Sequence, residues 1–254
     1  MKVFLDNCIM SASDTMQGAK KQSPLNWGGS VEWVDVIGYM RKPLPSVNHQ
    51  WKRDQIECLP TIGKIAKEGL ISLYTYFELQ AEGWKRAGSF PVNGIGQIFS
   101  GVTINHVEAA VERSSFCQIE LGRHVETQRV IDYCKWLISP GIEQFADQLT
   151  KKWHGSARAL HNLKKVQRFR ELCRGLAEKQ YPDAFHLWSA ELSGADIFLT
   201  IDGKFIRAMT ESKNIRLPCR PVSPSRLLEI LQVEEREPFE FREGIFYNIA
   251  GKPI

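Results

Sequence analysis

Four acidic residues stand where a predicted strand ends or a predicted helix begins, although long stretches of chain separate them. Asp6 follows the apolar run Val-Phe-Leu, and Glu78 follows the β-rich run Leu-Ile-Ser-Leu-Tyr. Asp183 opens a predicted helix, and Asp202 closes the predicted strand after that helix. Because these ends lie at one edge of a parallel α/β sheet, we expect the four carboxylates to lie close together.

A cluster of carboxylates favours a bound cation, because like charges repel and burying them without compensation is costly. Oxygen ligands select a hard divalent ion such as Mg²⁺ or Mn²⁺, which also binds substrate phosphates. Such ions activate water and stabilise the leaving oxygen of a phosphodiester. The sequence has no Cys/His cluster with zinc spacing and no Gly-x-Ser-x-Gly motif, so it offers no rival zinc or serine-hydrolase site.

Each acid also has a structural interpretation when it is taken alone. Asp6 is a candidate turn or helix-cap residue, and Asp202 precedes a glycine in a turn signal. Thr75 and Glu78 have the spacing of a capping box. Asp183 favours the positive N-terminus of its helix. The functional interpretation depends on finding the acids together.

The elements that must position these acids are predicted from hydrophobic spacing. Residues 51–68 have helical spacing, with a stop signal at Gly69, and a β-rich run follows. The segment that carries Asp183 and Asp202 is predicted to form a helix from Pro182, a left-handed stop at Gly194 and then a buried strand. A last short helix is expected from Arg226 to Leu231, with Pro224 and Ser225 at its start.

Two glycine-containing segments are predicted to be loops. Residues 14–35 look like an irregular connection, and we expect Trp27 and Trp33 to pin it to the core, with stacking on a nucleic-acid base as the alternative. Residues 88–101 are rich in glycine but lack the strand and the Gly-Lys-Ser/Thr signature of a phosphate loop, so we interpret them as a mobile loop.

The chain between these parts is predicted to be helical. Residues 105–137 are mostly helical in pattern, and one long helix or two cover about 142–179. One side of this last segment is apolar, whereas Lys164, Lys165 and Arg168 lie on the other. A solvated face is the simple interpretation, and contact with nucleic-acid phosphates is the functional one.

The composition is that of a folded, mildly basic protein. The 254 residues are 43% hydrophobic and 24% charged, with a formal net charge of +4 and a pI near 8.7. Such a charge is compatible with a nucleic-acid partner but does not demand one. The six cysteines are scattered, and no run approaches the ~20 apolar residues of a membrane span. We therefore expect a soluble cytoplasmic protein with reduced thiols.

Three motifs follow one another along the chain. They are Val-Phe-Leu-Asp-Asn ending at Asn7, Ile-Ser-Leu-Tyr-Thr-Tyr-Phe-Glu-Leu around Glu78, and Asp-Ala-Phe-His-Leu…Gly-Ala-Asp-Ile-Phe-Leu-Thr-Ile-Asp from Asp183 to Asp202. In this order they resemble the PIN-domain ribonucleases. The resemblance implies a three-layer α/β/α fold with a central parallel sheet. That PIN-like domain would span residues 1–232.

Two parts of the chain exceed a compact domain of this kind. One is a helical insertion at about residues 84–179, and the other is a C-terminal extension at 233–254. The insertion would cap the site or recruit a partner. The extension would add a hairpin or an oligomer contact.

The resemblance also implies roles for individual residues. Asp6, Glu78, Asp183 and Asp202 would hold Mg²⁺ or Mn²⁺, and Thr200 would orient a ligand or water. The activity implied is that of a metal-dependent endoribonuclease.

Three further residues lie near the motifs. His186 is a candidate metal ligand or base, but we expect it to hydrogen bond inside the fold. Glu82, one turn beyond Glu78, is a candidate auxiliary acid, although we expect it on a solvent-exposed helix face. Asp196 begins its strand at the opposite edge and is excluded.

Within the nuclease class, the leading role is the toxin of a toxin–antitoxin pair that a partner peptide silences. An RNA-processing or defence nuclease acting on RNA or single-stranded DNA is the alternative, and a homodimer is compatible with both. A non-catalytic PIN-like nucleic-acid-binding module is a rival from another class, although all four acids are retained. A phosphatase-type hydrolase is disfavoured because the Asp-x-Asp motif is missing after the first strand.

Overall fold

The computed structural model describes residues 1–84, 95–116, 126–149, 156–211 and 215–254. Contacts between residues divide the chain into two compact units. Unit 1 comprises residues 1–9, 69–86 and 103–223, and unit 2 comprises residues 10–68, 87–102 and 224–254. Each unit therefore joins segments that lie far apart in the sequence, and the chain leaves unit 1 within the first helix, α1 (Asn7–Ser13).

Unit 1 is built on a five-stranded parallel sheet of order β5-β4-β1-β6-β7. The strands are β1 (Lys2–Leu5), β4 (Ser72–Thr75), β5 (Ile104–His106), β6 (Ile197–Leu199) and β7 (Arg220–Val222). Central strand β1 pairs with β4 and β6, so Val3 lies between Leu73 and Ile197. Its last three residues are fully buried, as expected for a strand covered on both faces.

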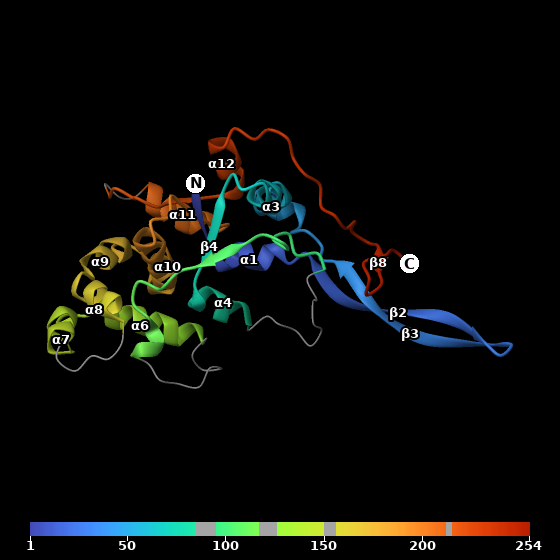
Figure 1. Cartoon of the computed structure of the whole chain (residues 1–254), viewed down its shortest axis with the longest axis horizontal. Coiled ribbons are helices and arrows are strands. Elements are labelled where there is room, and N and C mark those ends of the chain that lie inside the picture. Colours follow the sequence, from blue (N-terminus) through green and yellow to red (C-terminus); the bar gives the residue numbers. More distant parts are fainter. Residues whose placement is uncertain (85–94, 117–125, 150–155, 212–214) are drawn as a thin grey trace. The chain divides into compact units, whose positions relative to one another are not determined.

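Seven α-helices accompany this sheet among the described residues of unit 1 (Figure 1). They are α4 (Phe77–Trp84), α6 (Thr127–Ile138), α7 (Ile142–Leu149), α8 (Ala157–Lys164), α9 (Gln167–Cys173), α10 (Tyr181–Leu192) and α11 (Gly203–Thr210). Short 3₁₀ turns occupy Arg113–Ser115 and Glu178–Gln180. The expected α/β architecture with a central parallel sheet flanked by helices is confirmed.

Aromatic side chains fill the core of unit 1. Trp188 of α10 stacks on Phe169 of α9 with ring centroids 5.4 Å apart, and Phe185 meets Phe169 edge-on at 5.8 Å. Phe4 of β1 lies between Tyr76 and Phe198. Because α10 carries two of these rings, the core fixes the helix that begins beside Asp183.

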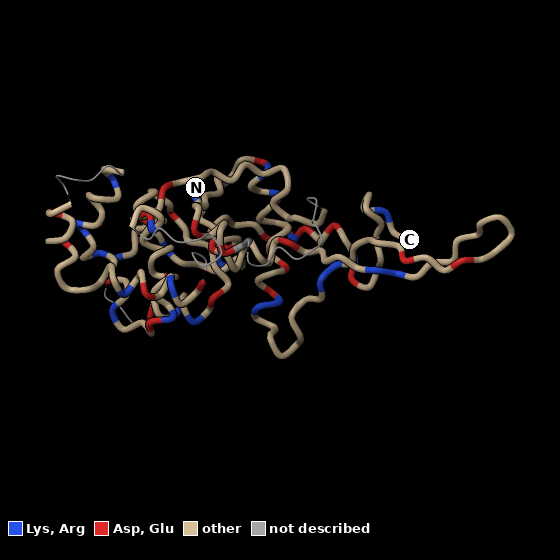
Figure 2. The backbone as a smooth tube through the Cα atoms, turned by 90° about the horizontal axis from the view of Figure 1, so that it is seen from below, with Lys and Arg blue, Asp and Glu red and all other residues tan. Residues whose placement is uncertain are grey.

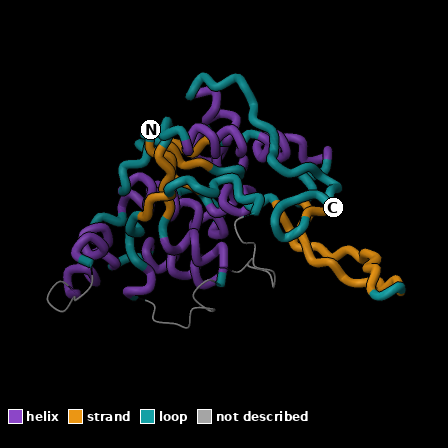
Figure 3. The backbone as a smooth tube through the Cα atoms, turned by 45° about the vertical axis from the view of Figure 1, so that its right-hand side comes forward, coloured by secondary structure: helices purple, strands orange, loops and turns teal. Residues whose placement is uncertain are grey.

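Unit 2 contains a long antiparallel hairpin, β2 (Met16–Trp27) and β3 (Ser30–Arg41), with β8 (Phe246–Tyr247) on the outer side of β3. Figure 3 shows the two long strands running side by side to their turn. The helices of unit 2 that lie wholly within it are α2 (Gln50–Glu57), α3 (Leu59–Lys67) and α12 (Pro224–Ile230), and a 3₁₀ turn lies at Val47–His49.

Several elements agree with the sequence predictions. Residues 51–68 form α2 and α3, with Gly69 at φ 78° after them. The helix predicted from Pro182 is α10, the glycine that ends it, Gly194, has φ 71°, and the strand after it is β6. The last predicted helix is α12. The five described cysteines are free thiols.

The prediction for residues 14–35 is wrong, because they form most of the hairpin. Gly28 and Gly29 have φ values of 59° and 90°, which suit the two-residue turn of a tight hairpin. Trp27 and Trp33 do not pin a loop to the core, since they are 73% and 67% exposed.

The helical predictions for 105–137 and 142–179 are only partly right. Residues 104–106 form strand β5 at the edge of the parallel sheet, and α6 begins at Thr127. The described residues of the second range form three short helices, α7, α8 and α9, rather than one or two long ones. Of the predicted mobile loop at 88–101, residues 88–94 lie outside the described residues.

The C-terminal extension adds strand β8 to the hairpin sheet, and Phe241 and Tyr247 pack with Met16 and Tyr39 in the core of unit 2. Within the described part of the chain, no helix is long and apolar enough to cross a membrane.

Candidate acidic site

Asp6 lies at the carboxyl end of β1 and is held by Leu199 and Thr200 at the end of β6 and by Cys8 of α1. Its backbone N–H donates to the Leu199 carbonyl at 3.0 Å. Its Oδ2 accepts from the Thr200 hydroxyl at 2.6 Å and from the Cys8 thiol at 2.8 Å. The residue is 6% exposed. The parallel pairing of β1 and β6 therefore sets both the position and the orientation of this carboxylate.

Asp183 joins Asp6 at a small cavity in unit 1. It stands in the first turn of α10, beside Pro182, so the core packing of α10 fixes where it lies. The cavity measures about 230 Å³. Its lining residues are Asp6, Asn7, Glu82, Thr127, Val130, Lys179, Pro182, Asp183 and His186. We call this cavity the acidic pocket.

The electrostatics of the acidic pocket are those of crowded carboxylates. The pKa of Asp183 is raised to about 7, first by burial and then by the charge of Asp6. The charges of Asp202 and Glu82 raise it further, and His186 opposes them. Without a bound cation, the pocket therefore holds a proton that an ordinary aspartate would release.

Glu82 and His186 form the side of the pocket contributed by α4 and α10. Asn7 Nδ2 donates to Glu82 Oε2 at 2.6 Å, and His186 Nε2 lies 3.5 Å from Glu82 Oε1. Tyr76 contacts His186 Nδ1 at 2.5 Å. Burial lowers the pKa of His186, but the hydrogen bond and charge of Glu82, with Asp6 and Asp183, outweigh it and raise that pKa overall.

Glu78 lies on α4 but does not line the acidic pocket. Arg113 donates to both of its carboxylate oxygens, from Nε to Oε1 at 3.2 Å and from Nη2 to Oε2 at 2.6 Å. The predicted capping box is absent as well, because Thr75 Oγ1 is buried without a hydrogen-bond partner. The carboxylate that was expected to bind metal is therefore engaged by a buried guanidinium.

Asp202 and Thr200 lie beside the pocket without lining it. Asp202 caps α11, with Oδ1 accepting from the N–H groups of Lys204 and Phe205 at 2.8 and 2.9 Å. The Thr200 hydroxyl accepts from the Asp202 N–H at 3.0 Å and donates to Asp6. Thr200 thus orients Asp6, whereas Asp202 contributes charge.

The predicted basic face is divided between two helices. Lys164, at the end of α8, pairs with Asp147 at 2.8 Å, and Lys165 is exposed between α8 and α9. Arg168, on α9, donates to both carboxylate oxygens of Glu191. Arg168 therefore packs α9 against α10. Over the backbone as a whole, Figure 2 shows basic (blue) and acidic (red) residues interspersed.

The donor types of the acidic pocket fit a hard divalent ion. Asp6, Asp183 and Glu82 offer carboxylate oxygens, and Asn7 Oδ1 is a buried oxygen with no hydrogen-bond partner. The described residues nevertheless contain no group of three or more His, Cys, Asp or Glu side chains already arranged to hold a metal ion. The pocket has suitable ligands, and their side chains would have to converge on an ion.

Three residues of this site are not assigned to it by the sequence prediction: Asn7, Glu82 and His186. Asn7 directly follows Asp6, and its position at a strand end was the available signal. The sequence prediction put Glu82 on a solvent-exposed helix face, whereas its side chain is 24% exposed and lines the pocket. His186 hydrogen bonds inside the fold as expected, through Tyr76, and also faces the pocket.

Comparisons with known proteins add no assignment: no protein-family model, no curated protein and no solved structure matches the chain.

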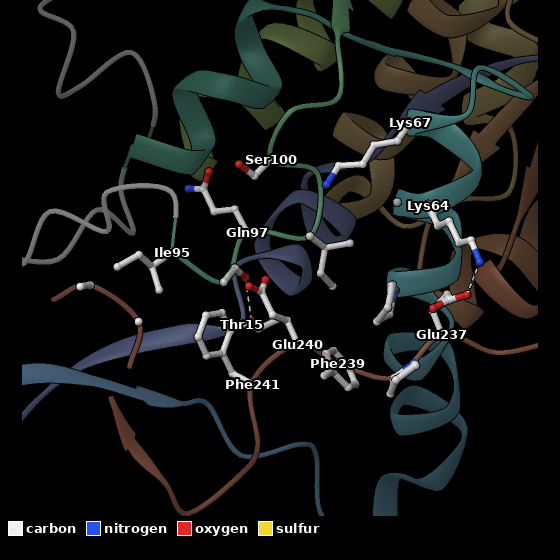
Figure 4. Close-up of a pocket in the computed structure, with 17 residues that line it drawn as sticks. Thr15, Lys64, Lys67, Ile95, Gln97, Ser100, Glu237, Phe239, Glu240 and Phe241 are labelled. Carbon is white, nitrogen blue, oxygen red and sulfur yellow. Dashed lines mark hydrogen bonds and ion pairs between the residues drawn. The ribbon is translucent and has the colours of Figure 1, made fainter. Parts of the chain in front are cut away.

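Unit 2 has a separate cavity of about 600 Å³, shown in Figure 4. Lys64 and Lys67 of α3 form one wall, and Phe239 and Phe241 lie opposite them. Lys64 pairs with Glu237 at 2.5 Å. Because that lysine is neutralised locally and the wall opposite is aromatic, the cavity has no concentrated charge of one sign.

Proposed function

We propose that the protein is a Mg²⁺- or Mn²⁺-dependent endoribonuclease and that the acidic pocket is its active site. The observation that carries the proposal is the convergence of Asp6 and Asp183 at one cavity, beside the unpartnered oxygen of Asn7. Burying such carboxylates together is costly in the absence of a cation. A PIN-like three-layer fold is proposed with it, supported by the parallel sheet and the acids at its carboxyl edge.

Asp6 and Asp183 would hold the ion, with Asn7 Oδ1 as a neutral ligand. A bound ion would neutralise these carboxylates and stabilise the negative charge that develops on a phosphodiester. Thr200 keeps the Asp6 carboxylate in one orientation through its 2.6 Å hydrogen bond. Lys179, an exposed residue in the pocket lining, is placed to attract a substrate phosphate.

Asp202 would support the site without lining the acidic pocket. Its carboxylate caps α11, and its charge adds to the field at Asp183. This field strengthens the attraction for a cation. The toxin role and the antitoxin partner stay predictions from the sequence resemblance.

The decisive experiment compares wild type with Asp6→Asn on labelled single-stranded RNA and DNA, with Mn²⁺ or with a chelator. We expect RNA cleavage by wild type with Mn²⁺, none with the chelator, and a loss of at least about 100-fold in Asp6→Asn, because the substitution removes a metal ligand. Asp196→Asn is the matched control, since this exposed acid precedes β6 at the opposite edge of the sheet. Cleavage that persists equally in Asp6→Asn would refute the proposal.

A further inference from the structure

We propose that Glu82, rather than Glu78, is the third carboxylate that binds the metal ion in the acidic pocket. We further propose that Asn7, His186 and Tyr76 position it. The inference rests on the proposed function. It changes one ligand of the site that the sequence predicted and adds three positioning residues to it.

The surroundings of Glu78 argue against a role as a ligand. Both of its carboxylate oxygens accept hydrogen bonds from the Arg113 guanidinium, and the two side chains are only 4% and 2% exposed. Turning Glu78 toward a metal ion would leave a buried guanidinium without its counter-charge, which is strongly unfavourable. Glu78 therefore acts as the partner of Arg113.

Glu82 has the surroundings that Glu78 lacks. It lies one helical turn further along α4 and lines the acidic pocket with Asp6 and Asp183. Among its contacts are a side-chain amide and an imidazole, at 2.6 Å to Asn7 Nδ2 and 3.5 Å to His186 Nε2. Each carboxylate oxygen has two lone pairs, so one hydrogen bond to an oxygen does not exclude a cation from it.

A chain of hydrogen-bonding side chains connects Glu82 to the core of unit 1 through His186 and Tyr76. The Ala110 backbone N–H can only donate, and it donates to Ser189 Oγ at 3.0 Å. The Ser189 hydroxyl in turn bonds to the Tyr76 phenol, which contacts His186 Nδ1 at 2.5 Å. With Tyr76 as donor to Nδ1, the remaining imidazole hydrogen is on Nε2 and faces Glu82. Tyr76 and His186 are both buried, and the imidazole tautomer sets which of them is the donor at their contact.

Asn7 completes the arrangement from the other side. Its Nδ2 donates to Glu82 Oε2, which fixes the orientation of the amide. Its Oδ1 is then left buried without a partner beside Asp6 and Asp183. One side chain thus orients Glu82 and presents its own oxygen to the pocket.

The test measures Mn²⁺ binding by calorimetry and RNA cleavage in the full chain. Glu82→Gln should weaken Mn²⁺ binding by about tenfold or more, because it removes a charged ligand. Tyr76→Phe, which removes only a hydroxyl group, should weaken it by about tenfold through loss of positioning. The comparison for Glu78 is the double variant Glu78→Met/Arg113→Met, which removes both buried charges and should leave the Mn²⁺ affinity within about threefold of wild type. Unfolding in chelator checks that each variant is folded.

The outcomes separate this inference from the proposed function. Wild type that binds Mn²⁺ and cleaves RNA, together with Glu82→Gln that binds Mn²⁺ equally well, would overturn the inference alone. So would a Glu78→Met/Arg113→Met variant that folds but loses Mn²⁺. If Tyr76→Phe lowers the unfolding temperature without changing Mn²⁺ affinity, Tyr76 is structural and its positioning role is refuted. Wild type that neither binds Mn²⁺ nor cleaves RNA would refute the proposed function itself.

Discussion

Glu78 and Glu82 lie one turn apart on the same helix, yet their carboxylates have different surroundings. Glu78 is enclosed with Arg113, whose Nη1 is buried and has no hydrogen-bond partner. Glu82 is partly exposed at the acidic pocket. The difference arises from Arg113, which belongs to a 3₁₀ turn that follows β5. A residue far along the chain therefore decides which acid of α4 reaches the pocket.

The Glu78–Arg113 pair predicts an asymmetric effect of mutation on stability. Arg113→Met alone should lower the free energy of unfolding by about 3–5 kcal/mol, because it leaves Glu78 buried without a counter-charge. Adding Glu78→Met should restore most of that loss, since two apolar side chains can replace a buried ion pair. Urea unfolding with chelator present measures the free energy of unfolding of the single and the double variant. Losses that simply add in the double variant would contradict the pairing.

At the residue scale, the sequence predicted the neighbours of the pocket better than their roles. Asp6 and Asp183 come together because one follows a central strand and the other opens a helix packed on the core. The sequence could not show which of Glu78 and Glu82 lines the acidic pocket, because both lie on one helix and the partner of Glu78 has no sequence signature. Asp202 follows strand β6 as the sequence predicted, but its hydrogen bonds to two backbone N–H groups show a capping role.

Among the elements, buried strands were predicted well and the exposed hairpin was missed. β1 and β6 are short apolar runs, and such runs are typical of strands buried on both faces. The hairpin has exposed side chains on most of β2 and β3, so its pattern lacks the alternation that marks a half-buried strand. The glycine pair at its turn was the remaining signal.

The junction of β3 with β8 gives a prediction at the element scale. A Cβ atom at Gly38 would lie 2.2 Å from the Tyr247 carbonyl oxygen and 2.7 Å from the Phe246 ring. Gly38→Ala should therefore push β8 away from β3 and destabilise unit 2 by about 1–3 kcal/mol. Hydrogen exchange of the β8 amides and thermal unfolding test this.

The neighbouring Ile37→Ala variant is the control for Gly38→Ala. Ile37 is half-exposed on the same strand, so its truncation should change stability by no more than about 0.5 kcal/mol. Equal stability of Gly38→Ala and wild type would mean that β8 does not pack closely against β3.

Across the whole molecule, the division into units does not follow the predicted insertion at 84–179. That range supplies β5 to the parallel sheet and the helices that pack with α10. Unit 2 instead combines residues 10–68 with the C-terminal segment from 224. Hydrophobic periodicity describes local elements, whereas this division depends on contacts between distant segments, which a single sequence does not reveal.

The pH dependence of the metal-free protein is a property of the whole molecule that follows from the acidic pocket. Asp183 is faced by Asp6, Glu82 and Asp202, whose charges disfavour its ionisation, and by His186, which favours it. Its pKa is about 7 in the folded protein against 3.8 for an ordinary aspartate. The folded state therefore retains a proton that the unfolded state releases, and the contribution of Asp183 to the free energy of unfolding falls as pH rises from about 4 to 7.

A shift of this size corresponds to a loss of up to about 4 kcal/mol across that window, with little further change above it from this group. Asp183→Asn, which resembles the protonated side chain, should lose this component of the slope. Saturating Mn²⁺ should also flatten the slope for wild type, because a cation favours the ionised carboxylate. Urea unfolding at a series of pH values measures the slope for wild type with chelator, for Asp183→Asn with chelator and for wild type with Mn²⁺. A slope that is identical in wild type and Asp183→Asn would show that Asp183 ionises normally and that the pocket does not concentrate negative charge.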